Sequence, residues 1–517
     1  NVVINFKMAA VRALLRRSYF KVYYNIRHNS SCSKRGLVLG AYTEDNNKFI
    51  LTPVAESFDK ENQGFIVDHL NVAGLKKGKA RVFYKPSKDV DVLAVVGLGK
   101  KSEKFDELND IDSRKENVRI AAGVGVKSLQ EVEVTDVRVE DFEDPVASAE
   151  GATLAAFAFQ EFKAEDKRKK IPTVSHYKAD EKKWTEGVVL GDSQNTARYL
   201  KELPSNLLTP TRFGELATKI LSEGSVKVTV HNKAWAESKK MGSFLAVAQG
   251  SKEEPKFLEM SYSCGSGLPN IVLVGKGVTF DTGGISIKPS AGMDAMRADM
   301  GGAAMVVATM QAISRLKLRL NVIGLCPLTE NMPGGAAIKP GDVVRASNGK
   351  SICIDNTDAE GRLILADALC YASTFNPCFT LDAATLTGAM KVALGAAATG
   401  CFTNSTKRFK QIQKAGTRTG DRIWRMPLYE AYTNRVTGFP AFDVHNVGQG
   451  SNKGGGACTA AAFLKEFAPP GDWMHLDIAG VMDLDPFHGM SYLGGSGMSG
   501  RPTRTVIEFL KGFQEEK

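Results

Sequence analysis

The stretch IVLVGKGVTFDTGGISIKP, residues 271–289, changes within a few residues from an apolar run to a turn rich in glycine and charge. Its first four residues are isoleucine, valine or leucine, which predicts a buried strand. Lys276, Asp281 and Lys288 follow among the glycines. Because ligands of open α/β sheets bind beyond the carboxyl ends of strands, this turn is a candidate functional site.

The same arrangement recurs in the second part of the chain. Further strand-like runs, each followed by a glycine- or acid-rich turn and usually by a helical pattern, span residues 320–325, 352–354 and 379–381. Strands that alternate with helices form parallel or mixed sheets with helices on their faces. Residues 205–517 are therefore predicted to form a larger C-terminal α/β domain with a central, mostly parallel sheet flanked by helices.

A smaller N-terminal α/β domain with a mixed sheet is predicted for residues 36–180. Its expected strands cover residues 36–42, 49–54, 80–84 and 90–96, and its alanine-rich helices cover residues 113–128 and 146–159. Residues 181–204 predict one linking helix between the two domains. This helix should stop at Pro204, because a proline disfavours helical backbone at the residue before it.

Length and composition indicate an α/β protein with more than one domain. A chain of 517 residues is too long for a single core, and 43% hydrophobic and 24% charged residues are ordinary for this class. No apolar stretch approaches the roughly 20 residues of a membrane-spanning helix, so no membrane partner is expected. The eight cysteines form no CxxC pair and predict reduced thiols, not a zinc finger or a disulfide framework.

The net charge of +10 is concentrated near the start of the sequence. Residues 1–35 contain eight basic residues and no acidic one, and subtracting these eight leaves +2 for the other 482 residues. A nucleic-acid partner therefore has little support. The segment 1–35 has the basic, acid-free composition of a mitochondrial targeting sequence, which predicts the mitochondrial matrix. A disordered basic arm on a cytoplasmic protein is the alternative.

Seven charged residues in three segments are the strongest candidates for chemistry. The segments are residues 274–289, RADMGG at 297–302 and NTDAEGRL at 356–363, and they carry Lys276, Asp281, Lys288, Asp299, Asp358, Glu360 and Arg362. In an extended segment, residues 358, 360 and 362 would point to one side. Four converging carboxylates repel one another unless cations neutralise them, and two divalent ions about 3.5–4 Å apart would do so.

The residue types alone leave two interpretations open. A single aspartate beside a lysine is usually a surface ion pair, whereas this many charges within apolar, glycine-rich segments favour a metal hydrolase, because unpaired burial is costly. None of the seven histidines lies in the three segments, so a histidine-based zinc site and a Ser-His-Asp triad lack local support. Oxygen ligands with one amine suit Mn²⁺, Mg²⁺, Co²⁺ or Zn²⁺.

Sequence motifs add a family resemblance. The octapeptide NTDAEGRL is the signature of the leucine aminopeptidase family, and VGKGxxFDxGGxxxK and MRADMGGAA match that family in order and spacing. Four downstream stretches also match: DAATLTGA (382–389), GDRIWRMPL (420–428), ACTAAAFLKEF (457–467) and HLDIAG (475–480). The resemblance covers residues 36–513 and implies a two-metal exopeptidase that releases Leu and other apolar residues from peptides with a free N-terminus.

The resemblance also implies a role for each metal ligand. Lys276 resembles the family's amine ligand, which must be neutral to bind a metal, and Asp299 resembles its companion at the tighter-bound ion. Asp281 and Glu360 resemble the bridging carboxylates. Asp358 resembles the ligand that completes the exchangeable site. The implied cofactors are two divalent ions, Zn²⁺ or Mn²⁺ with Mg²⁺ or Co²⁺ as alternatives, together with bicarbonate.

Two further residues are implied to act on the substrate directly. Lys288 resembles the residue that polarises the scissile carbonyl, and Arg362 resembles the residue that holds bicarbonate as the general base. An apolar specificity pocket is implied for Met296, Thr385, Gly388, Ala479 and Met482. Without the family, the same five residues read as ordinary core. A pocket of this kind discriminates weakly between apolar side chains, so broad selectivity is expected.

Three other functions compete with this interpretation. The first is a structural assembly protein of the same family whose catalysis is weak or dispensable. The second is DNA binding, which the near-neutral body of the chain disfavours. The third is a dipeptidase preference such as Cys-Gly. The resemblance further implies a homohexamer whose active sites face an interior cavity.

Overall fold

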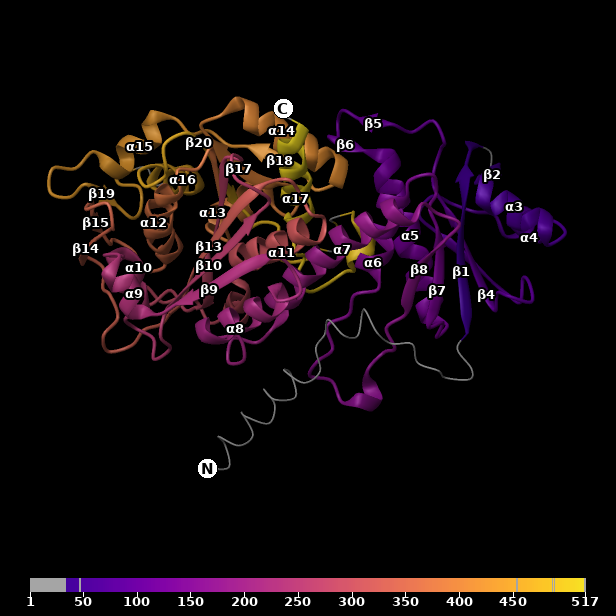
Figure 1. Ribbon diagram of the computed structural model, residues 1–517, viewed down its shortest axis with the longest axis horizontal. Coiled ribbons are helices and arrows are strands. Elements are labelled where there is room, and N and C mark those ends of the chain that lie inside the picture. The colour runs from indigo at the N-terminus through magenta and orange to yellow at the C-terminus, as the bar shows by residue number, and fades with distance from the viewer. Residues whose placement is uncertain (1–33, 46–47, 452–453, 486, 488, 516–517) are drawn as a thin grey trace. The chain divides into compact units, whose positions relative to one another are not determined.

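The computed structural model describes residues 34–45, 48–451, 454–485, 487 and 489–515 (Figure 1). The predicted targeting segment, residues 1–35, lies almost entirely outside the described residues. Two compact units make up the chain: residues up to 101 with 118–184, and residues 102–117 with 185–517. Within the described part, no helix combines the length and the apolar character needed to cross a membrane.

The smaller unit is built on a mixed sheet, as predicted, and the sheet has six strands. Its strands run in the order β3 (Ala80–Tyr84), β4 (Val92–Gly97), β1 (Arg35–Thr43), β7 (Asp136–Glu140) and β8 (Thr173–Tyr177), with β2 (Phe49–Leu51) paired to β1. β1 is parallel to β4 and β7, β7 is parallel to β8, and the pairings of β3 and β2 are antiparallel. The predicted strand at 49–54 ends early, because Thr52 caps the helix that begins at Pro53.

Helices cover both faces of this sheet. α3 (Pro53–Glu61) and α4 (Phe65–Ala73) bury Phe58, Ile66 and Leu70 against strand residues that include Leu37 and Leu93. On the other face, Gly125 of α5 (Ser113–Glu131) lies so close to Val38 that a Cβ there would be 2.2 Å from the valine side chain. This double cover explains why β1 and β4 are almost continuously apolar. α6 (Pro145–Ala155) also packs on β7 and β8.

The larger unit contains a nine-stranded sheet whose centre is parallel. The order is β18 (Ile423–Arg425), β17 (Thr399–Thr403), β20 (Asp472–Asp477), β16 (Phe379–Ala384), β11 (Asn270–Gly275), β13 (Asn321–Asn331), β10 (Lys256–Ser263) and β9 (Val226–His231), with β12 (Gly277–Asp281) beside β13. The central run from β20 to β13 is parallel throughout. Antiparallel pairs occur towards the edges, so the predicted central, mostly parallel sheet is confirmed.

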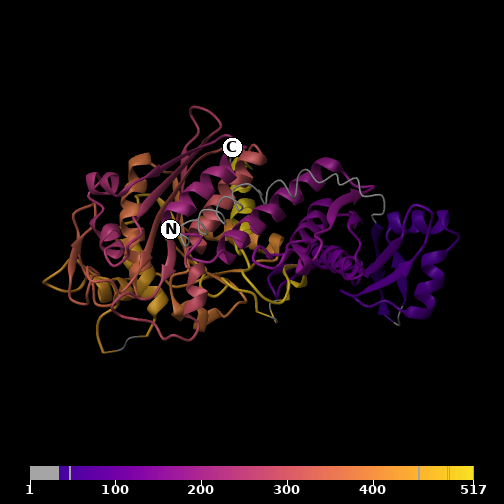
Figure 2. The same cartoon turned by 90° about the horizontal axis from the view of Figure 1, so that it is seen from below.

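Two groups of helices sandwich this sheet, and Figure 2 shows the unit in magenta to yellow from a second direction. One group comprises α10 (Gly242–Ala248), α12 (Glu360–Ala372) and α16 (Gly456–Lys465), which share a core with Val272 and Val274 of β11. The other includes α7 (Glu181–Glu202), α8 (Pro210–Leu221), α11 (Gly301–Arg315) and α17 (Thr503–Gly512); α11 packs on β11, α8 and α17. The remaining helices are α9 (Lys233–Ser238), α13 (Gly388–Leu394), α14 (Thr406–Thr419) and α15 (Glu430–Thr437).

A separate three-stranded sheet positions the segment that leads into α12. It consists of β14 (Val343–Arg345), β15 (Ser351–Cys353) and β19 (Val444–His445), with β15 and β19 parallel. The strand predicted at 352–354 therefore forms, but outside the main sheet. A two-stranded sheet of β5 (Phe105–Asp106) and β6 (Ile111–Asp112) completes the described strands.

The approach of α11 to the main sheet depends on glycine at its start. A Cβ at Gly302 would lie 2.0 Å from the Ala383 carbonyl oxygen of β16, and one at Gly275 would lie 2.6 Å from the Gly302 carbonyl oxygen. Both obstacles are backbone atoms, which cannot rotate away. The helix can therefore begin directly beside the strand ends only because these side chains are missing.

We expect Gly302→Ala to lower the thermal unfolding midpoint, because overpacking a core typically costs about 1–3 kcal/mol and here the clash is with backbone. The matched control is Gly512→Ala at the end of α17, where a Cβ meets nothing within 4 Å. Calorimetry of the full chain measures both midpoints. Equal midpoints for the two variants would contradict the proposed close packing.

Candidate metal centre

The predicted carboxylates and lysines converge beyond the carboxyl ends of the central strands. Lys276 follows β11, Asp281 is the last residue of β12, and Asp299 lies just before α11. Asp358 and Glu360 lie at the start of α12. The sheet thus brings together residues from three distant segments at the edge where the sequence predicted a site.

The buried half of this centre is organised by Lys276. Its Nζ atom lies 2.8 Å from Asp299 Oδ2 and 2.8 Å from Glu360 Oε1, and it donates a hydrogen bond of 2.9 Å to the Thr385 carbonyl oxygen. All three ionic side chains are almost completely buried. The helix that carries Glu360 can approach the amine because Gly361 lacks a Cβ, which would lie 2.7 Å from Nζ.

The other half is organised by Lys288 and is open to solvent. The Lys288 Nζ atom lies 2.8 Å from Asp281 Oδ2 and forms a shorter contact with Asp358 Oδ1. The side chains of Lys288 and Asp358 are 20% and 32% exposed. One oxygen each from Asp281, Asp358 and Glu360 lies within 4.8 Å of the others, a spacing that a metal ion could share.

The electrostatics of the centre show a shortage of positive charge. Burial raises the pKa of Asp299 well above its usual range, and the charges of Glu360 and Asp281 add to the effect. Burial followed by the charge of Asp281 also raises the pKa of Glu360, and burial raises that of Asp358. Burial opposes the charges of Lys276 and Lys288, but the carboxylates outweigh it and raise the pKa of both amines.

These residues fit divalent cations. Four carboxylates face only two ammonium groups, so bringing further positive charge into the cluster would relieve their repulsion. Asp299 Oδ2 is buried, and its partner in the described part of the chain is the Lys276 ammonium, 2.8 Å away. A carboxylate oxygen in that position is suited to a metal ion.

Arg362 presents a buried cationic edge beside the carboxylates. Its Nη1 group donates a hydrogen bond of 2.6 Å to the Asn446 carbonyl oxygen, while Nε has no partner among the described residues. Burial lowers the pKa of Arg362 to about 10, against the charges of Glu360 and Asp477, so the side chain is cationic at neutral pH. The unpaired N–H group could bind a small anion.

The prediction that residues 358, 360 and 362 lie on one extended segment is wrong. Helix α12 begins at Glu360, and the run LILADALCYA that follows has the apolar, strongly helix-forming composition that extends it to Ala372. Glu360 and Arg362 therefore lie in the first helical turn. Their functional groups reach the site through helix geometry and not through the alternation of a strand.

Two residues hold carboxylates of the centre by hydrogen bonds; Asn331 was not identified from the sequence, and Thr385 was predicted only as a pocket residue. Asn331, the last residue of β13, donates hydrogen bonds to Asp281 Oδ1 (2.8 Å) and to the Thr357 carbonyl oxygen (3.1 Å). Thr385 Oγ1 donates to Asp299 Oδ1 at 2.7 Å. The signal that could have indicated Asn331 is its place at the carboxyl end of a buried strand, the position that singled out the other candidates.

Contacts link three of the five predicted pocket residues to the buried half of the centre. Thr385 contacts Asp299 directly, and Met482 packs with Ala298 and Met498. Asp477 joins the segments that carry the others: its carboxylate accepts hydrogen bonds from Thr387 Oγ1 (2.7 Å) and from the backbone amides of Leu386 and Ala479 (3.2 Å each). Of the remaining two, Met296 is partly buried and Gly388 is exposed at the start of α13.

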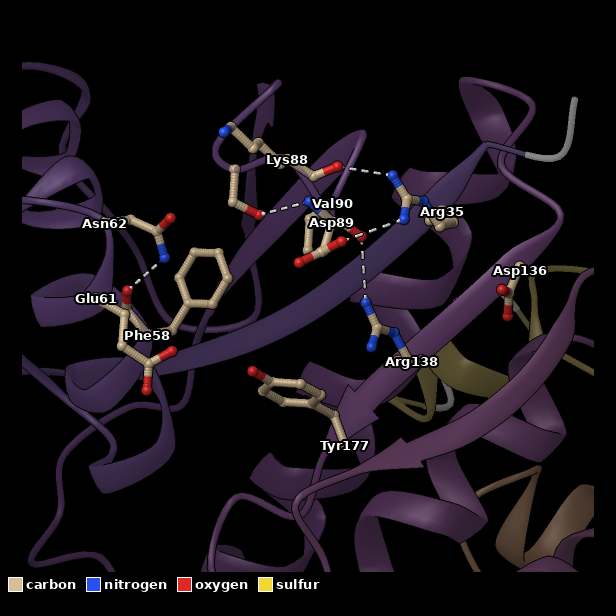
Figure 3. A pocket seen from close by; sticks show the side chains of 11 residues that line it. Arg35, Phe58, Glu61, Asn62, Lys88, Asp89, Val90, Asp136, Arg138 and Tyr177 are labelled. Carbon is tan, nitrogen blue, oxygen red and sulfur yellow. Dashed lines mark hydrogen bonds and ion pairs between the residues drawn. The ribbon is translucent and has the colours of Figure 1, made fainter.

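A cavity of about 800 Å³ lies in the smaller unit, and none of these residues lines it (Figure 3). Its arginines are already engaged: Arg35 contacts Asp89, Asp91 and the Lys88 carbonyl oxygen, and Arg138 donates to the Asp89 carbonyl oxygen. The cavity therefore lacks the excess of buried negative charge that the carboxylate cluster has. We place the chemistry at the cluster.

A two-unit α/β fold with lysine and carboxylate side chains gathered at strand ends is the arrangement expected of a metal-dependent hydrolase, and comparisons with known proteins identify the family. The model of the cytosol aminopeptidase family, catalytic domain, matches residues 195–507, and the model of its N-terminal domain matches residues 38–166. The chain therefore belongs to the cytosol aminopeptidase family, and the resemblance found in the sequence motifs is confirmed.

Individual relatives agree with this assignment. The chain is 50% identical over 499 residues to the cytosol aminopeptidase of Xenopus tropicalis, covering 95% of each chain, and 48% identical over 516 residues to that of Homo sapiens, covering 98% of each. Among solved structures, a tomato leucine aminopeptidase mutant matches with a TM-score of 0.77 at 27% identity, covering 93% of this chain and 94% of that one. The bottromycin maturation enzyme BotP in complex with Mn matches with a TM-score of 0.77 at 30% identity, covering 93% and 100%. The chain is a metal-dependent aminopeptidase.

Asn331→Ala is expected to weaken metal binding by about 10–100-fold, because the side chain orients Asp281. Isothermal titration of the metal-free full chain with Mn²⁺ measures the effect. The control is Asn321→Ala, at the opposite end of the same strand, where the side chain bonds a distant loop. Unchanged affinity in Asn331→Ala would show that Asp281 does not need this support.

The raised pKa values of Asp299, Glu360 and Asp358 predict a pH dependence of metal binding. Protons and metal ions compete for the same oxygens, so the affinity should fall as the pH is lowered and should begin to fall above the ordinary carboxylate range. Titration with Mn²⁺ from neutral pH down to about pH 4 tests this. An affinity that stays constant until about pH 4 would mean that the carboxylates titrate normally.

Proposed function

We propose that the chain is a two-metal aminopeptidase that removes Leu and other apolar residues from the N-termini of peptides. The observation that carries the proposal is the paired arrangement of cations within four carboxylates. Lys276 lies between Asp299 and Glu360, and Lys288 lies between Asp281 and Asp358. The cluster thus contains two adjacent positions at which positive charge is stabilised.

The ligands proposed for the two ions are Lys276, Asp281, Asp299, Asp358 and Glu360. Bound there, divalent ions would supply an acidified water and polarise the scissile carbonyl. Lys276 must lose its proton to become a ligand, and neighbouring divalent charge favours that loss. The hard oxygen set with one amine accommodates Zn²⁺ or Mn²⁺, with Mg²⁺ and Co²⁺ as alternatives.

Lys288 is proposed to stabilise the charge that develops on the substrate carbonyl oxygen. Its ammonium lies on the solvent-open side of the centre, where a peptide must approach, and Asp281 fixes its position. An ammonium group held there in advance acts more strongly on an oxyanion than on a neutral carbonyl, which lowers the barrier. The carboxylate-rich surroundings also favour a substrate with a free α-amine.

Arg362 is proposed to hold bicarbonate, which would supply the general base. The support is its buried guanidinium, fixed by Asn446 through one nitrogen and unpaired at Nε. The side chains proposed to line the specificity pocket are Met296, Thr385, Gly388, Ala479 and Met482. Met482 contributes an apolar surface next to Asp299 through its contact with Ala298. Because such a surface separates apolar side chains by only about 1–3 kcal/mol, selectivity should be broad.

We also propose that the chain assembles as a homohexamer and acts in the mitochondrial matrix. The larger unit exposes Val392, Trp424 and Tyr429, large apolar side chains that a subunit interface would cover. The basic, acid-free composition of residues 1–35 supports import. Light scattering that gives a stable monomer would refute the assembly, and a cytosolic signal from residues 1–35 fused to a reporter would refute the location.

Hydrolysis of a chromogenic leucine amide by the full chain, with and without Mn²⁺, tests the function. Turnover should require metal and should be lost in Glu360→Gln, which removes a ligand charge. Lys288→Met should retain metal but lose about 10²–10³-fold in kcat. Glu508→Gln, on the distant helix α17, should behave as the unmodified chain. No turnover from folded, metal-loaded protein would favour the structural assembly role instead.

A further inference from the structure

Cys353, Asp355 and His445 form a second cluster outside the proposed two-metal centre. Cys353 and His445 are directly paired on the parallel strands β15 and β19, and Asp355 follows two residues after Cys353. His445 Nδ1 lies 2.9 Å from Asp355 Oδ2, and Cys353 Sγ lies 3.9 Å from Asp355 Oδ1. One ligand-type atom from each residue lies within 4.8 Å of the other two.

The environment holds these donors in place but leaves one side open. Cys353 and His445 are buried at 6% and 8% exposure, whereas the Asp355 side chain is 28% exposed. The rings of Phe439 and Phe442 meet the imidazole edge-on, with ring centres 4.7 Å and 5.8 Å from it. An ion could therefore enter past Asp355 and find the imidazole already oriented.

We propose that Cys353, Asp355 and His445 bind an additional divalent cation of the Zn²⁺ type. Sulfur, imidazole nitrogen and carboxylate oxygen are the three ligand types of protein zinc sites. Zinc bonds of about 2.0–2.3 Å place tetrahedral ligand atoms roughly 3.3–3.8 Å apart, so only a small inward movement is needed. As the sulfur–zinc bond forms, the Cys353 thiol releases its proton to solvent.

The choice of metal follows from the contrast with the catalytic cluster. That cluster offers carboxylates and an amine, with neither sulfur nor imidazole, and so accepts several hard or borderline ions. Thiolate and imidazole select softer ions such as Zn²⁺ over Mg²⁺ or Mn²⁺. Gln449, which donates to Asp355 Oδ2 at 3.0 Å, lies at the rim and could provide the fourth ligand through its carbonyl oxygen, as could a water.

The cluster is connected to the catalytic segment through Asn446, the neighbour of His445. Asn446 Oδ1 accepts hydrogen bonds from the backbone amides of Asp355 (2.8 Å) and Asn356 (3.3 Å). The carbonyl oxygen of Asn446 accepts the hydrogen bond of Arg362. An ion bound to Asp355 and His445 would thus hold Asp355 directly and Arg362 through Asn446. These two residues lie on either side of Asp358 in the sequence.

The competing explanation is a purely hydrogen-bonded cluster, in which Asp355 accepts from His445 and Gln449 and binds no ion. Sulfur distinguishes the two. A thiolate bound to Co²⁺ produces an intense near-ultraviolet charge-transfer absorption, and the proposed catalytic ligands include no sulfur. Titration of the metal-free full chain with Co²⁺ therefore reports on this cluster whether or not the proposed aminopeptidase activity is observed.

We expect the charge-transfer absorption in the unmodified chain and its loss in both Cys353→Ser and His445→Asn. Elemental analysis should show one zinc fewer per chain in these variants. Cys264→Ser, which removes an exposed thiol, should keep the absorption and the zinc. Circular dichroism checks that the variants fold. If one of the two substitutions prevents folding, the other still tests the proposal.

Two results would overturn the proposal. The first is a folded, cobalt-loaded chain without the charge-transfer absorption. The second is an absorption that persists in Cys353→Ser or disappears in Cys264→Ser, because the sulfur ligand would then be another cysteine.

Discussion

Repulsion among four carboxylates at one edge of the larger sheet is the constraint on which the rest of the site depends. Asp281, Asp299, Asp358 and Glu360 are brought there by strand and helix ends that the fold fixes. Burying such charges without partners is prohibitive. The two lysines neutralise part of the charge, Asn331 and Thr385 donate to carboxylate oxygens, and the remaining excess suits divalent cations.

The same constraint explains the glycines around the site. A carboxylate can meet the buried amine of Lys276 only if helix α12 comes close, and Gly361 permits that approach. Gly302 and Gly275 likewise let α11 begin against β11 and β16, immediately after Asp299. The high glycine content of the motifs thus arises from close backbone contacts that any side chain would block.

The two proposed cation positions are not equivalent, because their surroundings differ in exposure. Lys276, Asp299 and Glu360 are almost completely buried, whereas Lys288 and Asp358 are partly exposed. An ion in the buried position loses its water and is surrounded by fixed ligands, so it should exchange slowly. An ion in the open position can keep water and exchange with substrate groups. The difference follows from burial, and the tight and exchangeable sites remain what the family resemblance implies.

The features that could be predicted are those that depend on residues close together in the sequence. Apolar runs indicated the central strands, and the charges at their ends indicated the site. β7 (DVRVE) and β8 (TVSHY) were missed because charged or polar residues interrupt each of these five-residue segments, so neither contains the continuous apolar run by which the other strands were recognised. The extended reading of residues 358–362 failed because the helical preference of the following ten residues determines their conformation. The hydrogen-bond partners of Asn331 and Asp477 could not be predicted, since they are 50 and about 90 residues away in sequence.

Asp382 and His475 show how two of the family motifs support the site without entering it. They are paired across β16 and β20, with His475 Nδ1 at 2.5 Å from Asp382 Oδ1, and Trp473 Nε1 donates to the other carboxylate oxygen at 2.8 Å. Both side chains are fully buried, so neither can act on a substrate as part of a triad. Ala384 and Asp477 lie two residues further along the same strands. Thr385, the residue after Ala384, donates a hydrogen bond to Asp299. A rigid polar pair inside the sheet thereby fixes the strand ends that carry the centre.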